Sequence, residues 1–216
     1  MASRDLINRI QEAFKEPDKV NAEEYQKIVE TLSGKVTDNV ERMLLFQVGL
    51  IAIFVLIAEN QIGILKIENF ELKEFSVIAI LIPLLFSYIH FNLVTSLAKF
   101  EQLSVLYKTI IRIRHEPIYK QRLTEFFLST PNLYDYKHFA RNGIVQGAQF
   151  ILWAIEFFTV TLLIPFAFQG YAFFKLFSLY GSNYPLLIGV SLAIAIIFGL
   201  QSFFCVITLV QETAPK

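Results

Sequence analysis

Four long stretches of the sequence are almost free of charged residues, and polar stretches separate them. They cover 43–58, which uncharged polar residues extend toward Leu65, and then 75–98, 144–174 and 176–211. Each supplies close to the ~20 apolar residues with which a helix crosses a hydrocarbon core of about 30 Å. A soluble bundle would need four helices that are apolar on every face, so the pattern predicts an all-α integral membrane protein with four transmembrane helices.

The polar segments also show helical periodicity. Leu6, Ile7, Ile10 and Phe14 share one helical face, and Pro17 ends that helix. The pair Asn21 and Glu24 resembles a capping box at the start of a second helix, for which Gly34 is a plausible end. Asp38 with Glu41 then resembles the cap of a helix that continues into the first span.

These features predict four regions along the chain. We expect a cytoplasmic helical N-terminal segment (1–41), transmembrane helices 1 and 2 (42–98), a basic, aromatic cytoplasmic helical segment (99–143), and transmembrane helices 3 and 4 with a short tail (144–216). The helical spacing of the second span runs without a break to Pro117, which predicts one long helix that projects from the membrane. Loops at 59–75 and 169–183 would lie on the other side of the membrane.

The distribution of basic residues predicts the orientation of the chain. Sixteen of its 19 Lys and Arg residues lie in 1–42, in 99–143 or in the C-terminal tail. Because cytoplasmic segments carry the excess of Lys and Arg, both termini are expected in the cytoplasm, with the protein in a cell inner membrane. The first span follows some forty mostly polar residues, so we expect it to be retained and not cleaved as a signal peptide.

Composition excludes several classes of protein. Hydrophobic residues make up 55% of the 216 residues and charged residues 18%, against roughly 45–50% and about 25% in soluble domains. The formal net charge is zero and there is a single cysteine, Cys205, which cannot form an internal disulfide. These values argue against a disordered chain and against a disulfide scaffold.

The cytoplasmic segment 99–143 is the candidate ligand-binding region. It has eight basic against four acidic residues, and it is rich in Tyr and Phe. Such a surface can bind phosphates while aromatic rings stack on bases, which makes it a candidate for a nucleotide or short oligonucleotide. The candidate ligand-binding residues are Lys108, Arg112, Lys120, Arg122 and Tyr119. Ordinary positive-inside bias with a small aromatic core, or binding of anionic lipid, would give the same pattern.

Glu156 is the charged residue that interrupts the third apolar stretch. Counted from Ile144 at 1.5 Å per residue, it lies about 18 Å into the membrane, just past the midplane. A carboxylate facing lipid there costs at least ~2.5 kcal/mol, so it should face water, bind a partner or be protonated. Gln146, Gln149 and Thr159 lie on roughly the same side of the helix, and the possible partners are His90, Asn92, Gln201 and Ser202. The alternative is a protonated Glu156 that only bonds a neighbouring helix.

A stripe of small residues follows the fourth span, formed by Ser191, Ala195, Gly199 and Ser202. Small residues let helices approach closely, so this stripe predicts a helix–helix contact within the chain or between subunits. It could equally accommodate bulky Phe side chains from the third span.

No pattern in the sequence indicates an enzyme, a metal site or a cofactor. The three histidines are scattered and lack metal-ligand spacing, and neither a glycine-rich phosphate loop nor a nucleophile elbow is present. We therefore expect either a homo-oligomeric ion channel or pore, with copies of Glu156 around its axis, or a non-conducting anchor that recruits a cytoplasmic partner. An ion-coupled transporter that uses Glu156 and His90 ranks last, because no internal repeat is evident.

The organisation of the chain resembles that of small membrane effectors of bacterial antiphage defence, of the CBASS-like or Hailong type. The resemblance is carried by the helical N-terminal segment, the four spans, the basic insertion at 99–143 and the near absence of extracellular mass. It is a resemblance of organisation, without a shared motif or ligand residue. It implies a channel that depolarises the inner membrane under the control of a nucleotide signal.

Overall fold

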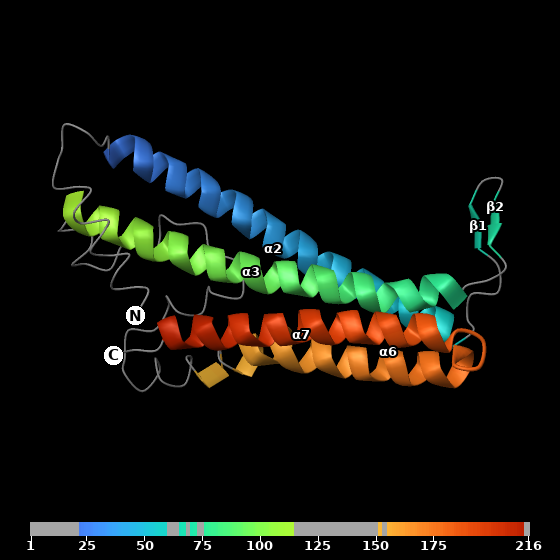
Figure 1. Cartoon of the computed structure of the whole chain (residues 1–216). Coiled ribbons are helices and arrows are strands. Elements are labelled where there is room, and N and C mark those ends of the chain that lie inside the picture. Colours follow the sequence, from blue (N-terminus) through green and yellow to red (C-terminus); the bar gives the residue numbers. More distant parts are fainter. Residues whose placement is uncertain are drawn as a thin grey trace. The chain divides into compact units, whose positions relative to one another are not determined.

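The computed structural model describes residues 22–59, 65–67, 70–72, 76–114, 151–152 and 155–213. Its elements in chain order are α2 (Ala22–Ala58), the strands β1 (Leu65–Ile67) and β2 (Phe70–Leu72), α3 (Ser76–Arg114), the π-helical turn η3 (Thr159–Leu163), α6 (Ile164–Tyr180) and α7 (Pro185–Thr213) (Figure 1). Four helices are long and apolar enough to cross a membrane. The prediction of four helices that are long and apolar enough to span a membrane is therefore confirmed.

The chain divides into two compact units. The first unit comprises Met1–Glu41, Thr95–Phe157 and Cys205–Lys216, and the second comprises Arg42–Val94 and Phe158–Phe204. Helices α2, α3 and α7 contribute residues to both units. The apolar middle parts of the helices, and most of the polar contacts discussed below, belong to the second unit.

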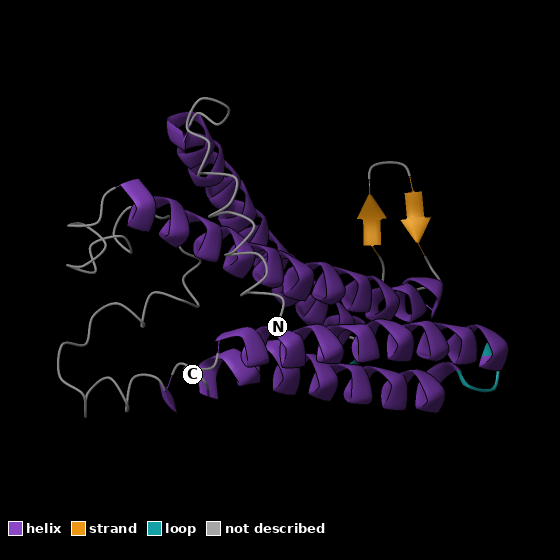
Figure 2. Ribbon diagram, turned by 60° about the vertical axis from the view of Figure 1, so that its left-hand side comes forward, coloured by secondary structure: helices purple, strands orange, loops and turns teal. Residues whose placement is uncertain are grey.

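Aromatic side chains fill the core of the second unit. The ring of Phe168 on α6 lies 5.6 Å from that of Phe54 on α2 and 4.6 Å from that of Phe86 on α3, measured between centroids. These three side chains are almost completely buried. Edge-to-face and tilted pairs of this kind each contribute about 0.5–1.5 kcal/mol beyond the burial of their area. They join α2, α3 and α6, and Figure 2 shows the helices of the chain as purple ribbons.

Helix α2 is continuous over 37 residues, so the predicted end at Gly34 and the predicted cap at Asp38 are both wrong. Val29, Ser33, Thr37 and Val40 form an unbroken buried stripe across this region. A glycine inside a helix costs only about 1 kcal/mol relative to alanine, which a packed stripe readily offsets. The residues expected to form the first N-terminal helix, including Phe14, lie outside the described part of the chain.

Helix α3 is continuous over 39 residues although it contains Pro83. This confirms the predicted long second helix as far as Arg114. Proline has no N–H and disturbs the preceding turn, so nearby carbonyl groups need other donors. The hydroxyl of Ser191 on α7 donates to the Ile80 carbonyl at 3.2 Å, and the hydroxyl of Ser87 donates to the Pro83 carbonyl at 2.9 Å. Ser191 thus supplies a donor within the turn that the proline disturbs, whereas the bond from Ser87 is an additional one to a carbonyl that the proline does not free.

Two predicted boundaries are wrong. Leu65 does not extend the first helix but begins β1, which pairs antiparallel with β2 in the register Leu65↔Leu72. The predicted loop 169–183 is largely helical, because α6 runs to Tyr180 and the connection to α7 spans only Gly181–Tyr184. A single charge at Lys175 does not end a helix, whereas Gly181, Asn183 and the proline that begins α7 are strong turn signals.

Candidate functional site

A buried polar contact joins α2 to α3 inside the second unit. The side-chain nitrogen Nε2 of Gln47 lies 3.1 Å from Nδ1 of His90. The two residues are only 5% and 4% exposed, so water does not compete for this contact. The ring of His90 is also nearly parallel to that of Phe86, with 6.4 Å between the centroids.

The donor in this contact fixes the tautomer of His90. The amide Nε2 of Gln47 can only donate, so Nδ1 of a neutral His90 accepts and the proton lies on Nε2. The backbone carbonyl of Thr161 in η3 approaches the ring, although no hydrogen bond of good geometry to Nε2 forms within the described part of the chain. The buried N–H of His90 therefore has the Thr161 carbonyl as its nearby acceptor.

Gln169 on α6 provides a second buried polar group. Its amide Nε2 donates to the Pro83 carbonyl at 2.9 Å and to Oγ of Ser87 at 2.7 Å. Its carbonyl oxygen Oε1 is buried and has no hydrogen-bond partner among the described residues. The two bonds of Nε2 fix the orientation of the amide, so Oε1 points away from α3.

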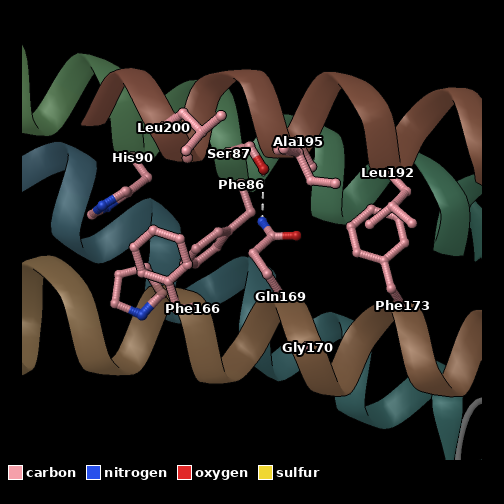
Figure 3. Close-up of a pocket in the computed structure, with 13 residues that line it drawn as sticks. Phe86, Ser87, His90, Phe166, Gln169, Gly170, Phe173, Leu192, Ala195 and Leu200 are labelled. Atoms are coloured by element: carbon pink, nitrogen blue, oxygen red, sulfur yellow. Dashed lines mark hydrogen bonds between the residues drawn. The ribbon is translucent and has the colours of Figure 1, made fainter. Parts of the chain in front are cut away.

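His90 and Gln169 both line one pocket of about 260 Å³ between α3, α6 and α7. Figure 3 shows the Gln169 amide hydrogen-bonded to Ser87 on one side, with its oxygen turned toward the part of the pocket near Ala195 and Leu192. The lining is otherwise apolar. It comprises Phe86, Ser87, His90, Pro165, Phe166, Gln169, Gly170, Phe173, Leu192, Ala195, Ile196, Gly199 and Leu200. A mostly apolar pocket with a few convergent polar groups is the usual form of a small-molecule site.

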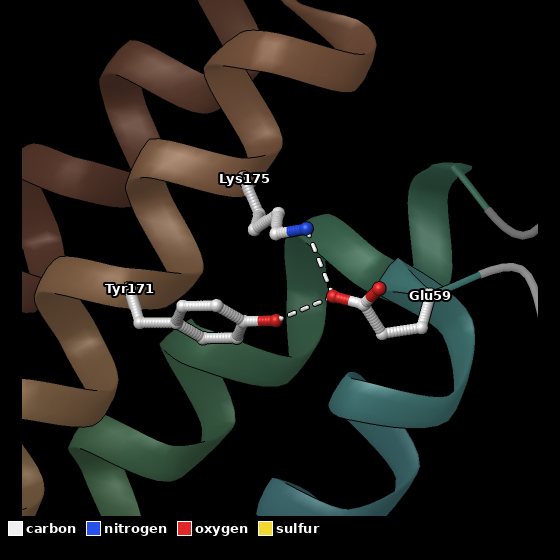
Figure 4. A network of polar contacts seen from close by, with 3 residues as sticks. All are labelled: Glu59, Tyr171 and Lys175. Atoms are coloured by element: carbon white, nitrogen blue, oxygen red, sulfur yellow. Dashed lines mark hydrogen bonds and ion pairs between the residues drawn. The ribbon is translucent and has the colours of Figure 1, made fainter.

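An ion pair at the end of α2 marks one edge of the apolar region of the second unit. The Glu59 carboxylate oxygen Oε1 accepts hydrogen bonds from the Lys175 ammonium at 2.8 Å and from the Tyr171 hydroxyl at 3.0 Å (Figure 4). The Lys175 nitrogen also lies 5.8 Å from the centroid of the Tyr171 ring. The hydrogen bonds from Lys175 and Tyr171 and the charge of Lys175 lower the pKa of Glu59. Charged groups collect at the ends of transmembrane helices, so this cluster indicates one membrane surface.

The position of Lys175 indicates the depth of the polar residues of α6. Gln169 and Pro165 precede Lys175 by 6 and 10 positions, which corresponds to roughly 9 Å and 15 Å along the helix axis. If Lys175 is at one membrane surface, both residues are deep in a hydrocarbon core of about 30 Å. Glu156 belongs to the first unit, and Ile144, from which its depth was counted, lies outside the described part of the chain. The expected depth of Glu156 therefore remains a prediction.

Three of the four predicted partners of Glu156 make other contacts. His90 contacts Gln47, the Asn92 amide donates to the Tyr88 carbonyl, and the Ser202 hydroxyl donates to the Phe198 carbonyl. Gln201 is exposed. The Glu156 side chain is also exposed and makes no polar contact with any described residue. Because residues 115–150 lie outside the described part of the chain, the expected shelter of Glu156 stays a prediction.

The remaining predicted site residues are only partly described. Thr159 is half-buried and begins η3. Lys108 is half-buried on α3, and Arg112 is on the same helix with a side chain that is not described. Outside the described residues lie Gln146, Gln149, Tyr119, Lys120 and Arg122. Their predicted roles therefore remain predictions.

The small residues of the fourth span pack inside the chain. Ser191, Ala195 and Ser202 are buried, which confirms that the stripe is a packing face. A Cβ atom built on Gly199 would lie 3.3 Å from Cε1 of Phe166, a contact tighter than usual. Phe166 is on α6, so at Gly199 the small residue accommodates a Phe of the third span.

Sequence reasoning missed Gln169, although it is the polar residue that ties α6 to α3. It falls in the segment that we expected to be a loop, where a glutamine attracts no notice. The signal that could have found it is its place in a long uncharged stretch, where polar side chains need partners. In the described part of the chain, no three His, Cys, Asp or Glu side chains are grouped to hold a metal. The pocket can instead offer one hydrogen-bond acceptor, Oε1 of Gln169, to a ligand.

Comparisons with known proteins give no further indication of function: no family model matches the sequence, and no curated protein and no solved structure matches it significantly.

Proposed function

We propose that this chain is a subunit of a homo-oligomeric ion channel or pore in a cell inner membrane, with both termini in the cytoplasm. In this proposal the cytoplasmic segment 99–143 receives a nucleotide or short oligonucleotide signal and controls the pore. The protein would then act as a membrane-depolarising defence effector, as its resemblance in organisation implies.

The observation that carries the proposal is an unpaired polar side chain on the outside of an apolar helix. Gln201 is exposed on α7, inside an uncharged stretch of the sequence, and no described residue pairs with it. A buried amide without a hydrogen-bond partner costs about 1–3 kcal/mol by protein mutational data, and lipid offers no partner. A second copy of the chain, or a water-filled path between copies, would supply the hydrogen-bond partner that the Gln201 amide lacks among the described residues.

Helix α7 is also the least buried of the four apolar helices. Of its most apolar stretch of 18 residues, 22% is buried within the structure, against 50% for α3. Gly189 and Ala193 are exposed on α7, and a Cβ on Gly189 would meet no atom within 4 Å. Small exposed residues in a transmembrane helix favour close contact with another helix. This surface therefore suits contact between copies.

A path for ions is better built between copies than inside one. The core of the second unit is filled by aromatic side chains such as Phe54, Phe86 and Phe168. In a closed ring of subunits, the exposed Glu156 of each copy would contribute to a ring of carboxylates around the pore axis. Rings of acidic side chains favour cations.

Helix α3 could couple the signal to the membrane-spanning part. It carries His90 and Ser87 in its apolar half and Lys108 and Arg112 farther along, without a break in the helix. A continuous helix can transmit a displacement at one end as a rigid element.

Cation selectivity tests the ring of Glu156. We expect the purified chain to conduct in planar bilayers under a KCl gradient, with a reversal potential that favours potassium. Glu156→Gln should move this potential toward zero, whereas Asp38→Asn, which changes an exposed carboxylate elsewhere on the chain, should not. If both variants keep the selectivity of the wild type, Glu156 has no place in the pore.

Ligand binding tests the proposed signal separately. Charge reversal at Lys108, Arg112, Lys120 and Arg122 should abolish binding of cyclic nucleotides or short oligonucleotides, and wild-type binding should weaken steeply with salt. Binding that is absent, or that survives the reversal, contradicts the gating proposal. A chain that binds a cytoplasmic partner but never conducts would be the anchor considered from the sequence.

A further inference from the structure

We propose that the pocket lined by His90 and Gln169 binds an uncharged amphiphile taken from the membrane, with an apolar body and a hydroxyl group. The hydroxyl would donate to Oε1 of Gln169. This inference concerns a site inside the second unit and does not depend on whether the chain conducts ions.

The size and lining of the pocket suit a small apolar body. A cavity of about 150 Å³ lined by aliphatic and aromatic side chains can hold benzene. The pocket here is larger, about 260 Å³, and Phe86, Phe173 and Leu192 provide similar walls. A chain of several methylene groups, or a small ring system, would therefore fit.

The buried polar atoms define the chemistry of the ligand. Oε1 of Gln169 is a buried acceptor without a donor among the described residues, whereas Nε2 of His90 has the Thr161 backbone beside it. Unsatisfied buried groups of this kind are rare in native proteins and call for a partner. A hydroxyl group supplies the donor that Gln169 lacks. No acidic or basic side chain other than the imidazole of His90 lines the pocket, so an ionised ligand would be buried without a counter-charge.

The pocket is accessible from the side that would face lipid. Phe166, Ile196 and Leu200 line it and are 46%, 52% and 52% exposed. All three are on the apolar stretches of α6 and α7. A ligand that partitions into the bilayer reaches this opening directly, whereas a water-soluble ligand would have to cross apolar surface.

Two isomeric competitors test the hydrogen bond without altering the protein. The full-length chain in phosphatidylcholine vesicles would be labelled with a diazirine analogue of 1-octanol that keeps its hydroxyl, and the labelled residues identified by mass spectrometry. We expect labels on pocket residues such as Phe173 and Leu192. 1-Octanol should compete about tenfold better than heptyl methyl ether at equal mole fraction in lipid, because the ether has no donor; this factor corresponds to 1.4 kcal/mol.

A matched pair of variants tests the location. Ala195 is buried and lines the pocket, whereas Ala193 on the same helix is exposed and does not. Ala195→Leu should fill the pocket and lower labelling at least tenfold, and Ala193→Leu should leave it unchanged. Gln169→Met should retain labelling but remove the preference for the alcohol.

Three results would overturn the proposal. The first is equal competition by alcohol and ether in the wild type, which would mean that acyl chains fill the pocket without regard to a donor. The second is labelling that maps outside the pocket. The third is labelling that Ala195→Leu does not reduce. If Gln169→Met fails to fold, the wild-type competition and the two alanine variants still decide the question.

Discussion

The contact between Gln47 and His90 should contribute measurably to the stability of the second unit. Gln47→Leu removes the donor to Nδ1 of His90 and leaves this buried nitrogen without a partner. His90→Phe keeps a ring that can stack on Phe86 but leaves the Gln47 amide unpaired. Each single variant thus leaves one buried polar group without its hydrogen-bond partner, whereas the double variant removes both groups of the pair.

The expected magnitude follows from burial and from the apolar solvent. In soluble cores, stranding a buried polar group costs about 1–3 kcal/mol. In membranes, side-chain hydrogen bonds average about 0.6 kcal/mol with a maximum near 1.7, because the unfolded chain in lipid also finds partners. Gln47 and His90 are almost fully buried, so we expect about 1 kcal/mol for each single variant. The double variant should be close to wild type, so the coupling energy should be about 2 kcal/mol.

A double-mutant cycle measures this coupling. Unfolding of the purified chain in mixed detergent micelles would be followed by circular dichroism for the wild type, both single variants and the double variant. The control is the exposed contact between Asn39 and Ser96 in the first unit, 3.4 Å long, for which alanine substitutions should couple by less than about 0.3 kcal/mol. Coupling between Gln47 and His90 no greater than this control would refute the reasoning.

Three further substitutions test other parts of the fold. Because Lys175 and Tyr171 lower the pKa of Glu59, their contact stabilises the chain above the usual glutamate pKa of about 4.3 and is lost as pH falls through the lowered value. The melting-temperature difference between wild type and Glu59→Gln should therefore shrink from pH 7 to pH 3; a constant difference would contradict this. Phe54→Ala should lower the unfolding free energy by about 2 kcal/mol. This is less than the roughly 3–5 kcal/mol lost in soluble cores, because apolar lipid or detergent solvates the Phe54 ring when the chain unfolds. A loss below about 0.5 kcal/mol would argue against the aromatic core. The buried Tyr107 hydroxyl donates to the Glu30 carboxylate at 3.1 Å, so Tyr107→Phe should cost about 1–2 kcal/mol in the same assay, and no change would mean that this bond is not formed.

The helices could be predicted from the sequence because a segment that crosses hydrocarbon needs about 20 residues that are almost free of charge. Stretches free of charge are read directly, and the long α3 followed from unbroken spacing beyond the second span. Helix ends were less predictable. At Gly34 the weak tendency of glycine to end a helix competes with the packing of the buried stripe Val29, Ser33, Thr37 and Val40. The packing is the stronger effect, and it depends on residues far away in the sequence.

The contacts between helices could not be predicted, because they join residues far apart in the sequence. Lys175 looked like a loop charge, yet it pairs with Glu59, 116 positions away. Gln169 contacts Ser87 over a separation of 82 positions. His90 was recognised as polar, but its partner Gln47 was not, because composition shows which groups need partners and not which helix faces meet.

Single-channel recording of the purified chain in a planar bilayer tests the central claim most directly. The proposal of a homo-oligomeric pore predicts discrete current steps that appear when the wild-type protein is incorporated and that remain with Asp38→Asn. Protein that is inserted in the membrane, as shown by protease protection of the same preparation, and that never produces current steps would contradict it.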